Sequence, residues 1–112
     1  MSPTELDIKE FKEDQIYRIS AAGDLIITNA RTLQNRIDHA LQEGASYVTI
    51  NLCDIQYIDS FGIGVIVKTK SDVDKKQGNL RVQVNPTLYT LFEKCHLDDY
   101  IHLEMVSEEA EA

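Results

Sequence analysis

The sequence predicts a single α/β domain, with a mixed sheet of four to five strands and helices packed mainly on one face. Short segments of alternating apolar residues take turns with segments of helical period, which gives the order β-β-α-β-α-β-α-β. The chain has 112 residues, the size of one domain, and its 43% hydrophobic and 27% charged residues are typical of globular proteins. Strands that alternate with helices imply right-handed crossovers, so most of the sheet is predicted to be parallel.

The first two strands are predicted to form a hairpin. Apolar residues alternate with polar ones over residues 6–9 and again over 17–21, with a polar turn at 13–15 between them. Residues 22–24, which include a glycine, are expected to end the second strand. Strands joined by a short turn run antiparallel, so this hairpin makes the otherwise parallel sheet a mixed one.

Three helices are predicted where apolar residues recur at steps of three and four. The first lies between Asn29, a predicted N-cap, and Gly44, a predicted C′ residue. The second starts near Ser60 and ends near Gly78, and the third starts at Asn85, an N-cap that is followed by proline. The apolar stripes of the first and third helices are Ala30, Leu33, Ile37, Ala40 and Leu41, and Leu88, Leu91, Phe92 and Cys95.

Three further strands are predicted at residues 47–53, 80–84 and 101–105. The strand at 47–53 is the most β-like, and its second face is only partly polar. We therefore expect it to be central and covered on both sides. Residues 54–59 are expected to form a connection rather than a strand.

The charge of the chain disfavours two classes of function. Eleven lysines and arginines stand against nineteen acidic residues, a net charge of −8. Some of the acids lie in residues 107–112, which we predict to be a frayed tail after a domain at 1–106. The rest of the chain is still acidic, whereas phosphate contacts need a basic face. Direct binding to nucleic acid or to an anionic membrane is therefore disfavoured.

The cysteines and the apolar runs indicate a cytoplasmic protein without a metal or cofactor. Cys53 and Cys95 lack the spacing of metal ligands and end apolar segments, so both are predicted to be buried, reduced thiols. No apolar run approaches the length that spans a membrane, so no membrane insertion is expected. No signal peptide is visible at the N-terminus.

Residues 57–64 (Y-I-D-S-F-G-I-G) lead from a predicted strand into a predicted helix. Ser60 is a candidate N-cap, because its hydroxyl can accept from the free N–H groups of a first helical turn. Gly62 and Gly64 each cost a helix about 1 kcal/mol relative to alanine, which suggests a backbone that something approaches closely. The alternative is that Ser60 only caps the helix and the glycines only let it pack on the sheet. Spacing alone favours that alternative.

Residues 59–64 (D-S-F-G-I-G) after an apolar strand resemble the D-S-[ST]-G-[LI]-G signature of STAS domains, the sulphate-transporter and anti-sigma-factor-antagonist domains. The order of elements and the length resemble the stand-alone anti-sigma factor antagonists over nearly the whole chain. Residues 23–25 are similar in part to the family's G-[ED]-[LI]-D turn. Residues 85–86 and 91–92 are similar to its S-P-x-x-x-x-x-L-F region.

The resemblance implies a protein switch that is not itself an enzyme. In the family, an unphosphorylated antagonist binds an anti-sigma factor that is also a serine kinase, and thereby releases the sigma factor. The kinase phosphorylates the serine that aligns with Ser60, and a PP2C-type phosphatase reverses the reaction. We expect a monomer or a weak dimer. The predicted partner-binding residues are Asp24, Asp59, Ser60, Phe61, Gly62 and Val65.

A phosphate on Ser60 is compatible with the predicted fold. Backbone N–H groups and the helix dipole favour an anion at a helix start. The phosphate adds about −1.5 to −2 charges beside Asp59, on a surface that a partner must desolvate, so binding can be lost without refolding.

Two positions depart from the family pattern and keep other functions open. Phe61 replaces the usual serine or threonine after the phosphoacceptor, and Ile26 replaces the last aspartate of the turn. Both departures favour an alternative, a STAS interaction subunit of a scaffold or transporter complex without a phosphorylation switch. A small hydrolase that uses Ser60 is the third hypothesis, and the lack of an assembled base counts against it.

A helical wheel places Phe61 and Val65 together, on the side that also holds Lys68 and Asp72. The pair is predicted to be an exposed contact patch beside the motif. The alternative is that Phe61 folds back over residues 25–27. The predicted core stripe on the opposite side is Ile63, Ile66, Val67 and Val73.

Overall fold

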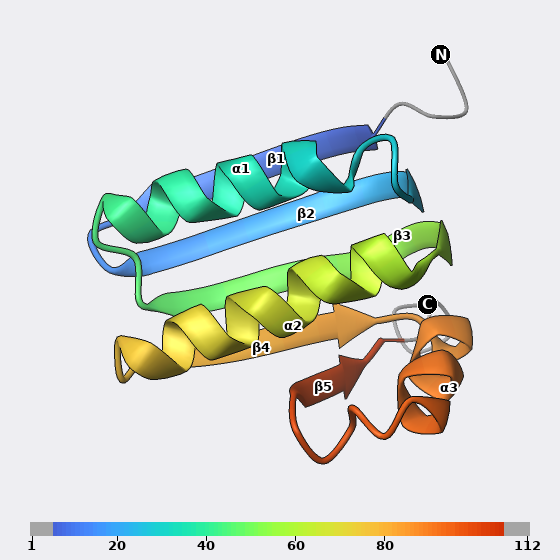
Figure 1. Cartoon of the computed structure of the whole chain (residues 1–112). Helices are drawn as coiled ribbons and strands as arrows, with labels where there is room; N and C mark the ends of the chain where they lie inside the picture. The colour runs from blue at the N-terminus through green and yellow to red at the C-terminus, as the bar shows by residue number, and fades with distance from the viewer. Residues whose placement is uncertain (1–5, 107–112) are drawn as a thin grey trace.

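The computed structural model describes residues 6–106 and contains the elements in the predicted order. The five strands form one sheet in which the spatial order β1-β2-β3-β4-β5 equals the order in the chain (Figure 1). Strands β1 and β2 are antiparallel and the other neighbours are parallel, as predicted. The elements are β1 (Leu6–Glu13), β2 (Ile16–Leu25), α1 (Ala30–Gln42), β3 (Tyr47–Ile58), α2 (Ser60–Lys75), β4 (Asn79–Val84), α3 (Pro86–Lys94) and β5 (His102–Met105).

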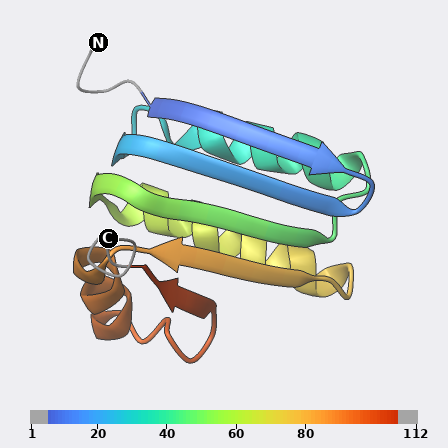
Figure 2. The same cartoon turned by 180° about the vertical axis from the view of Figure 1, so that it is seen from behind.

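Helices α1 and α2 lie side by side on one face of the sheet, and α3 lies at the end of β4 (Figure 1). Figure 2 shows the opposite face of the sheet, which none of the helices described here covers. Strand β3 is central, as predicted, but the expectation that both of its faces are covered is wrong. Thr49 and Asn51 on its second face are polar enough to remain partly in water, and both are half-buried.

The core lies between the sheet and the two helices. Ile19, Ile50 and Val82 stand beside one another in the register of β2, β3 and β4, and all three are buried. Every residue of the predicted stripe of α1 is also buried. Each fully buried aliphatic side chain contributes about 1.5–3 kcal/mol, so this layer supplies most of the stabilisation of the fold.

Strands β1, β2 and β3 are longer than the sequence predicts, and β1 runs to Glu13, a residue predicted to lie in the turn. β2 continues through Gly23, whose φ of 115° is in the left-handed region. Two register shifts, between Ser20 and Ala22 and between Gly23 and Asp24, let pairing with β3 continue to Ile58. The shifts also end the simple alternation of residues 54–57, which explains why they resemble a connection in the sequence.

The cysteines differ from their predicted state. Cys53 is half-buried and Cys95 is exposed, and neither forms a disulfide. Cys53 extends the row of Thr49 and Asn51 on the uncovered face, whereas Cys95 lies at the C-cap of α3, beyond the helical turns that pack. Within residues 6–106, no helix is long and apolar enough to cross a membrane. The predicted tail at 107–112 lies outside the described residues.

Candidate partner-binding site

Asp59, rather than Ser60, caps helix α2. Its carboxylate oxygen Oδ1 accepts hydrogen bonds from the backbone N–H groups of Phe61, at 2.9 Å, and Gly62, at 3.0 Å. A carboxylate can accept several such bonds and interacts favourably with the helix dipole. The prediction that Ser60 is the N-cap is therefore wrong by one residue. Ser60 is the first residue of α2, and it is exposed.

The second oxygen of Asp59 binds a different part of the chain. Oδ2 accepts from the backbone N–H of Ile27 at 2.9 Å, and the backbone N–H of Asp59 donates to the carbonyl oxygen of Leu25 at 3.2 Å. One side chain thus connects the loop after β2 to the first turn of α2. Ser60 follows this connection directly and is held at the carboxyl end of β2 and β3.

Asn29 holds the same loop from its other end. Its side-chain oxygen accepts from the backbone N–H of Ile26 at 2.9 Å, and its amide donates to the carbonyl oxygen of Asp24 at 2.8 Å. Asp24 pairs in register with Tyr57 of β3, two residues before Asp59. The structure therefore brings the predicted site residue Asp24 to the same end of the sheet as Ser60.

The two glycines of the motif have different structural roles. A Cβ atom on Gly62 would lie 2.7 Å from the carbonyl oxygen of Leu25 and 2.7 Å from Cγ1 of Ile58. Glycine is therefore required there by the close packing of α2 on the ends of β2 and β3. Gly64 is exposed, and a Cβ atom on it would meet nothing within 4 Å. Packing within the described structure therefore gives no reason for glycine at position 64.

Three large apolar side chains at this end of the sheet are exposed. Phe61 is 54% exposed, and Ile27 and Tyr57 are each 59% exposed. We call these residues the apolar triad. The backbones of Phe61 and Ile27 bind the same carboxylate, and Tyr57 lies two residues before it. The predicted exposure of Phe61 is confirmed, and its alternative as a buried cover over the loop is wrong.

The sequence did not identify Ile27 and Tyr57 as members of this surface. The one local signal is Tyr57 itself, a large apolar residue directly before the buried Ile58. Ile27 carries no signal in the sequence, because the bond that brings it to Phe61 spans 32 residues.

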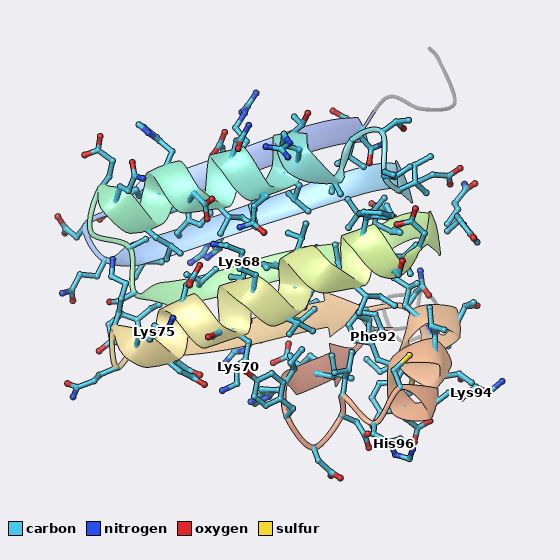
Figure 3. The ribbon with its side chains drawn as sticks, in the orientation of Figure 1. Lys68, Lys70, Lys75, Phe92, Lys94 and His96 are labelled. Carbon is cyan, nitrogen blue, oxygen red and sulfur yellow. The ribbon has the colours of Figure 1, made fainter. Side chains whose placement is uncertain are left out.

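Val65 is not part of the exposed surface. It is only 6% exposed, so the prediction that it is exposed beside Phe61 is wrong. It shares a side of α2 with Lys68, whose Nζ lies 3.5 Å from Oδ1 of Asp38 on α1 and 2.7 Å from Oδ2 of Asp72 (Figure 3). That side of α2 faces α1. A helical wheel of α2 alone does not include this neighbouring helix. The bond to Asp72 and the charge of Asp38 outweigh partial burial and raise the pKa of Lys68.

The core stripe of α2 also differs from the predicted one. Ile66 and Val73 are buried as predicted, but Ile63 and Val67 are only half-buried. Because α2 packs on both the sheet and α1, its buried face is rotated toward α1. The buried residues of α2 are Gly62, Val65, Ile66, Thr69 and Val73.

The fold is that of a STAS domain. The STAS domain family model matches residues 6–111, and the chain belongs to this family, as predicted. Over 104 residues, the chain is 31% identical to the anti-sigma-B factor antagonist of Bacillus subtilis (strain 168). The aligned residues cover 92% of this chain and 93% of that protein. The anti-sigma-B factor antagonist of Staphylococcus epidermidis is 28% identical to it over 99 residues, which cover 88% of this chain and 92% of that protein.

Solved structures agree on the fold. An anti-sigma factor antagonist from Mycobacterium paratuberculosis superposes with a TM-score of 0.81 at 18% identity, over 91% of this chain and 87% of that one. The Bacillus protein SpoIIAA in its phosphorylated form superposes with a TM-score of 0.71 at 16% identity, over 96% of each chain.

Proposed function

We propose that this protein is an anti-sigma factor antagonist whose binding to an anti-sigma factor is controlled by phosphorylation of Ser60. The observation that carries the proposal is the position of Ser60. It is exposed, it is the first residue of α2, and it directly follows the carboxylate that caps the helix. The relatives in Bacillus subtilis and Staphylococcus epidermidis are named anti-sigma-B factor antagonists. SpoIIAA, which shares the fold, exists in unphosphorylated and phosphorylated forms.

The hydrogen bonds around Ser60 support a switch that acts through charge. The backbone N–H groups of Ile27, Phe61 and Gly62 already donate to Asp59. A phosphate on Ser60 would find these donors occupied, so most of its charge would stay at the surface beside the Asp59 carboxylate. A partner that buries Ser60 would then have to desolvate two adjacent anionic groups. We infer that phosphorylation weakens binding while α2 remains folded.

The apolar triad supports a protein partner. Exposed aromatic side chains at the centre of an interface often contribute the largest share of binding free energy. Phe61, directly after Ser60, and Tyr57, three residues before it, supply two such exposed side chains, and Ile27 adds a third on the loop. The open space at Gly64 lets a partner approach the backbone of α2 closely. Asp24 would lie at the rim.

In this proposal the protein is a substrate and a binding partner rather than an enzyme. A cytoplasmic anti-sigma factor with serine kinase activity modifies Ser60, and a PP2C-type phosphatase restores the binding form. The second candidate is a STAS interaction subunit without a phosphorylation switch. One observation favours it, because the exposed Phe61 ring stands beside Ser60 where the family usually has a small hydroxyl residue.

The test combines kinase treatment with a binding titration against the cognate anti-sigma factor. After incubation with ATP, intact mass is expected to show one phosphate on the wild type and none on Ser60→Ala. Ser60→Ala is expected to bind within a few-fold of the unmodified wild type. Ser60→Asp is expected to bind at least about tenfold more weakly, because it adds a charge beside Asp59.

Thr87→Asp is the matched control, since Thr87 is an exposed residue in the first turn of α3. It is expected to leave binding unchanged. Equal affinities for Ser60→Ala and Ser60→Asp would favour the subunit without a switch. A phosphate found only on another residue would contradict the assignment of Ser60.

A further inference from the structure

Strand β1 forms a long exposed edge of the sheet. Among the strands of residues 6–106 it pairs only with β2 (Figure 2), and its last five residues, 9–13, are all exposed. The opposite edge strand, β5, has four residues. An edge strand presents backbone N–H and C=O groups along one side and can pair with a further strand.

The hairpin determines which residues of β1 present their backbone to that edge. Glu13 pairs with Ile16 across a two-residue turn, and such a turn is closed by a hydrogen-bonded pair. Hydrogen-bonded and non-hydrogen-bonded pairs alternate along an antiparallel ladder. Residues 9, 11 and 13 therefore bond toward β2, whereas the backbone groups of Glu10 and Lys12 point away from it.

The charges of β1 are complementary to a second copy of β1 in one register. When Phe11 stands opposite Phe11 of an antiparallel copy, Lys9 faces Glu13 and Glu10 faces Lys12 of that copy. In this register the Glu10–Lys12 pair is the hydrogen-bonded one, which agrees with the outward backbone groups. A two-fold axis at residue 10 would instead oppose Glu10 with itself, and an axis at residue 12 would oppose Lys12 with itself. Like charges directly opposite are destabilising, and opposite charges stabilise a cross-strand pair.

The side chains around Phe11 agree with this pairing. Phe11 is 48% exposed on the uncovered face of the sheet, and the guanidinium of Arg18 lies 5.5 Å from the centre of its ring. On the helix face, Glu10 accepts a hydrogen bond from the Tyr17 hydroxyl at 2.8 Å and pairs with Arg36. Partial burial raises the pKa of Glu10, but these two donors outweigh it, so the pKa is lowered and the carboxylate is ionised at neutral pH. Each of its two oxygens accepts one of these bonds and can accept a further donor, such as a lysine of a second copy.

We propose that two copies of this chain associate through β1, antiparallel about a two-fold axis at Phe11, so that one sheet continues across both copies. Lysines on an edge strand usually discourage pairing, but here each lysine faces a glutamate of the second copy. The pairing uses only five residues from each copy, so the dimer is expected to be weak and dependent on salt. Strand β2 separates β1 from β3 and the start of α2, so Ser60 remains accessible in both copies.

A disulfide between two copies tests the register. Directly opposed residues in a non-hydrogen-bonded pair have Cα atoms about 4.5 Å apart, within the range for a disulfide. In a Cys95→Ser background that retains Cys53, Phe11→Cys is expected to form a covalent dimer under mild oxidation. Lys9→Cys and Glu13→Cys are each expected to remain monomeric alone and to cross-link when mixed. The background protein itself is expected to form no cross-link.

A charge exchange tests the same contacts without cysteine chemistry. Sedimentation velocity over a range of concentrations is expected to show a monomer–dimer equilibrium for the full chain. Lys9→Glu is expected to weaken the dimer about tenfold or more, and Lys9→Glu combined with Glu13→Lys is expected to restore it. Unchanged melting midpoints would show that the variants fold. A wild type that stays monomeric, a double variant that fails to restore the dimer, or the absence of a disulfide in Phe11→Cys would each overturn the proposal.

Discussion

Helices α2 and α3 begin in the same way, but only α2 carries the candidate site. Each follows a parallel strand, and each is capped by the side chain of the residue before it. Asp59 accepts from two N–H groups of α2, and Asn85 accepts from the N–H of Leu88 at 2.9 Å. Both caps also reach a neighbouring segment. Asp59 binds the N–H of Ile27, and the amide of Asn85 donates to the carbonyl oxygens of Cys53 and Ile55, at 3.1 and 2.9 Å.

The difference between the two helices lies in the residues after the cap. In α3 a neutral cap precedes Pro86, and the buried Phe92 anchors the helix against the rest of the fold (Figure 3). In α2 an anionic cap precedes Ser60 and the exposed Phe61, and Gly64 has open space around it. Asp59 and Asn85 therefore share a structural role, since each caps its helix and joins it to a neighbouring segment. On α2 itself, the features proposed for partner binding begin at its first residue, Ser60, and Tyr57 and Ile27 add to them from outside the helix.

Removal of each cap is expected to give the largest effects on stability, and partner binding is expected to distinguish the two helix starts. Asp59→Ala loses three hydrogen bonds to backbone N–H groups, and we expect it to lower the free energy of unfolding by about 2–3 kcal/mol. Asn85→Ala loses one bond from a backbone N–H and two to backbone carbonyl oxygens, and it is expected to cost about 2 kcal/mol. Denaturant melts measure both. Only Asp59→Ala is also expected to weaken binding to the anti-sigma factor, and equal binding losses would contradict the functional difference between the two helix starts.

Truncation of the exposed aromatic side chain is the next largest test. Phe61→Ala is expected to weaken partner binding by about 2 kcal/mol, as the loss of an aromatic anchor does. Its free energy of unfolding is expected to change little, because the ring is exposed. Thr87→Ala changes the equivalent position of α3 and is expected to leave binding unaltered. A titration beside a denaturant melt reports both quantities. Unchanged binding for Phe61→Ala would remove the apolar triad from the proposed interface.

The smallest effect is expected at Gly64. Gly64→Ala is expected to raise the free energy of unfolding by about 0.5–1 kcal/mol, because alanine favours the helix and its Cβ meets open space. The same variant is expected to weaken partner binding if the partner approaches this turn closely. Gly62→Ala is the control of opposite sign, since its Cβ would meet Leu25 and destabilise the fold. A Gly64→Ala variant with unchanged binding would place the partner elsewhere on α2.

Local patterns predicted the features that depend on neighbours in the chain. The stripe of α1, the order of the elements and the proline-led start of α3 follow from periodicity and capping chemistry alone. The burial of Val65 depends on the side-by-side packing of α1 and α2, which a single-helix wheel does not contain. The role of Asp59 depends on a bond to Ile27, and the extension of β3 depends on register shifts in β2. These features arise between segments, so no single segment carries their signal.

The spatial order of the strands equals their order in the chain, and this has a consequence for folding during synthesis. Each strand pairs with the strand synthesised just before it, so the sheet can grow by one strand at a time as the chain leaves the ribosome. No segment has to be inserted between two others that are already paired, and no connection has to be threaded. The bond from Ile27 to Asp59 can form as soon as β3 and the start of α2 have emerged. The setting of Ser60 can therefore be assembled cotranslationally, before α3 and β5 complete the other edge of the sheet.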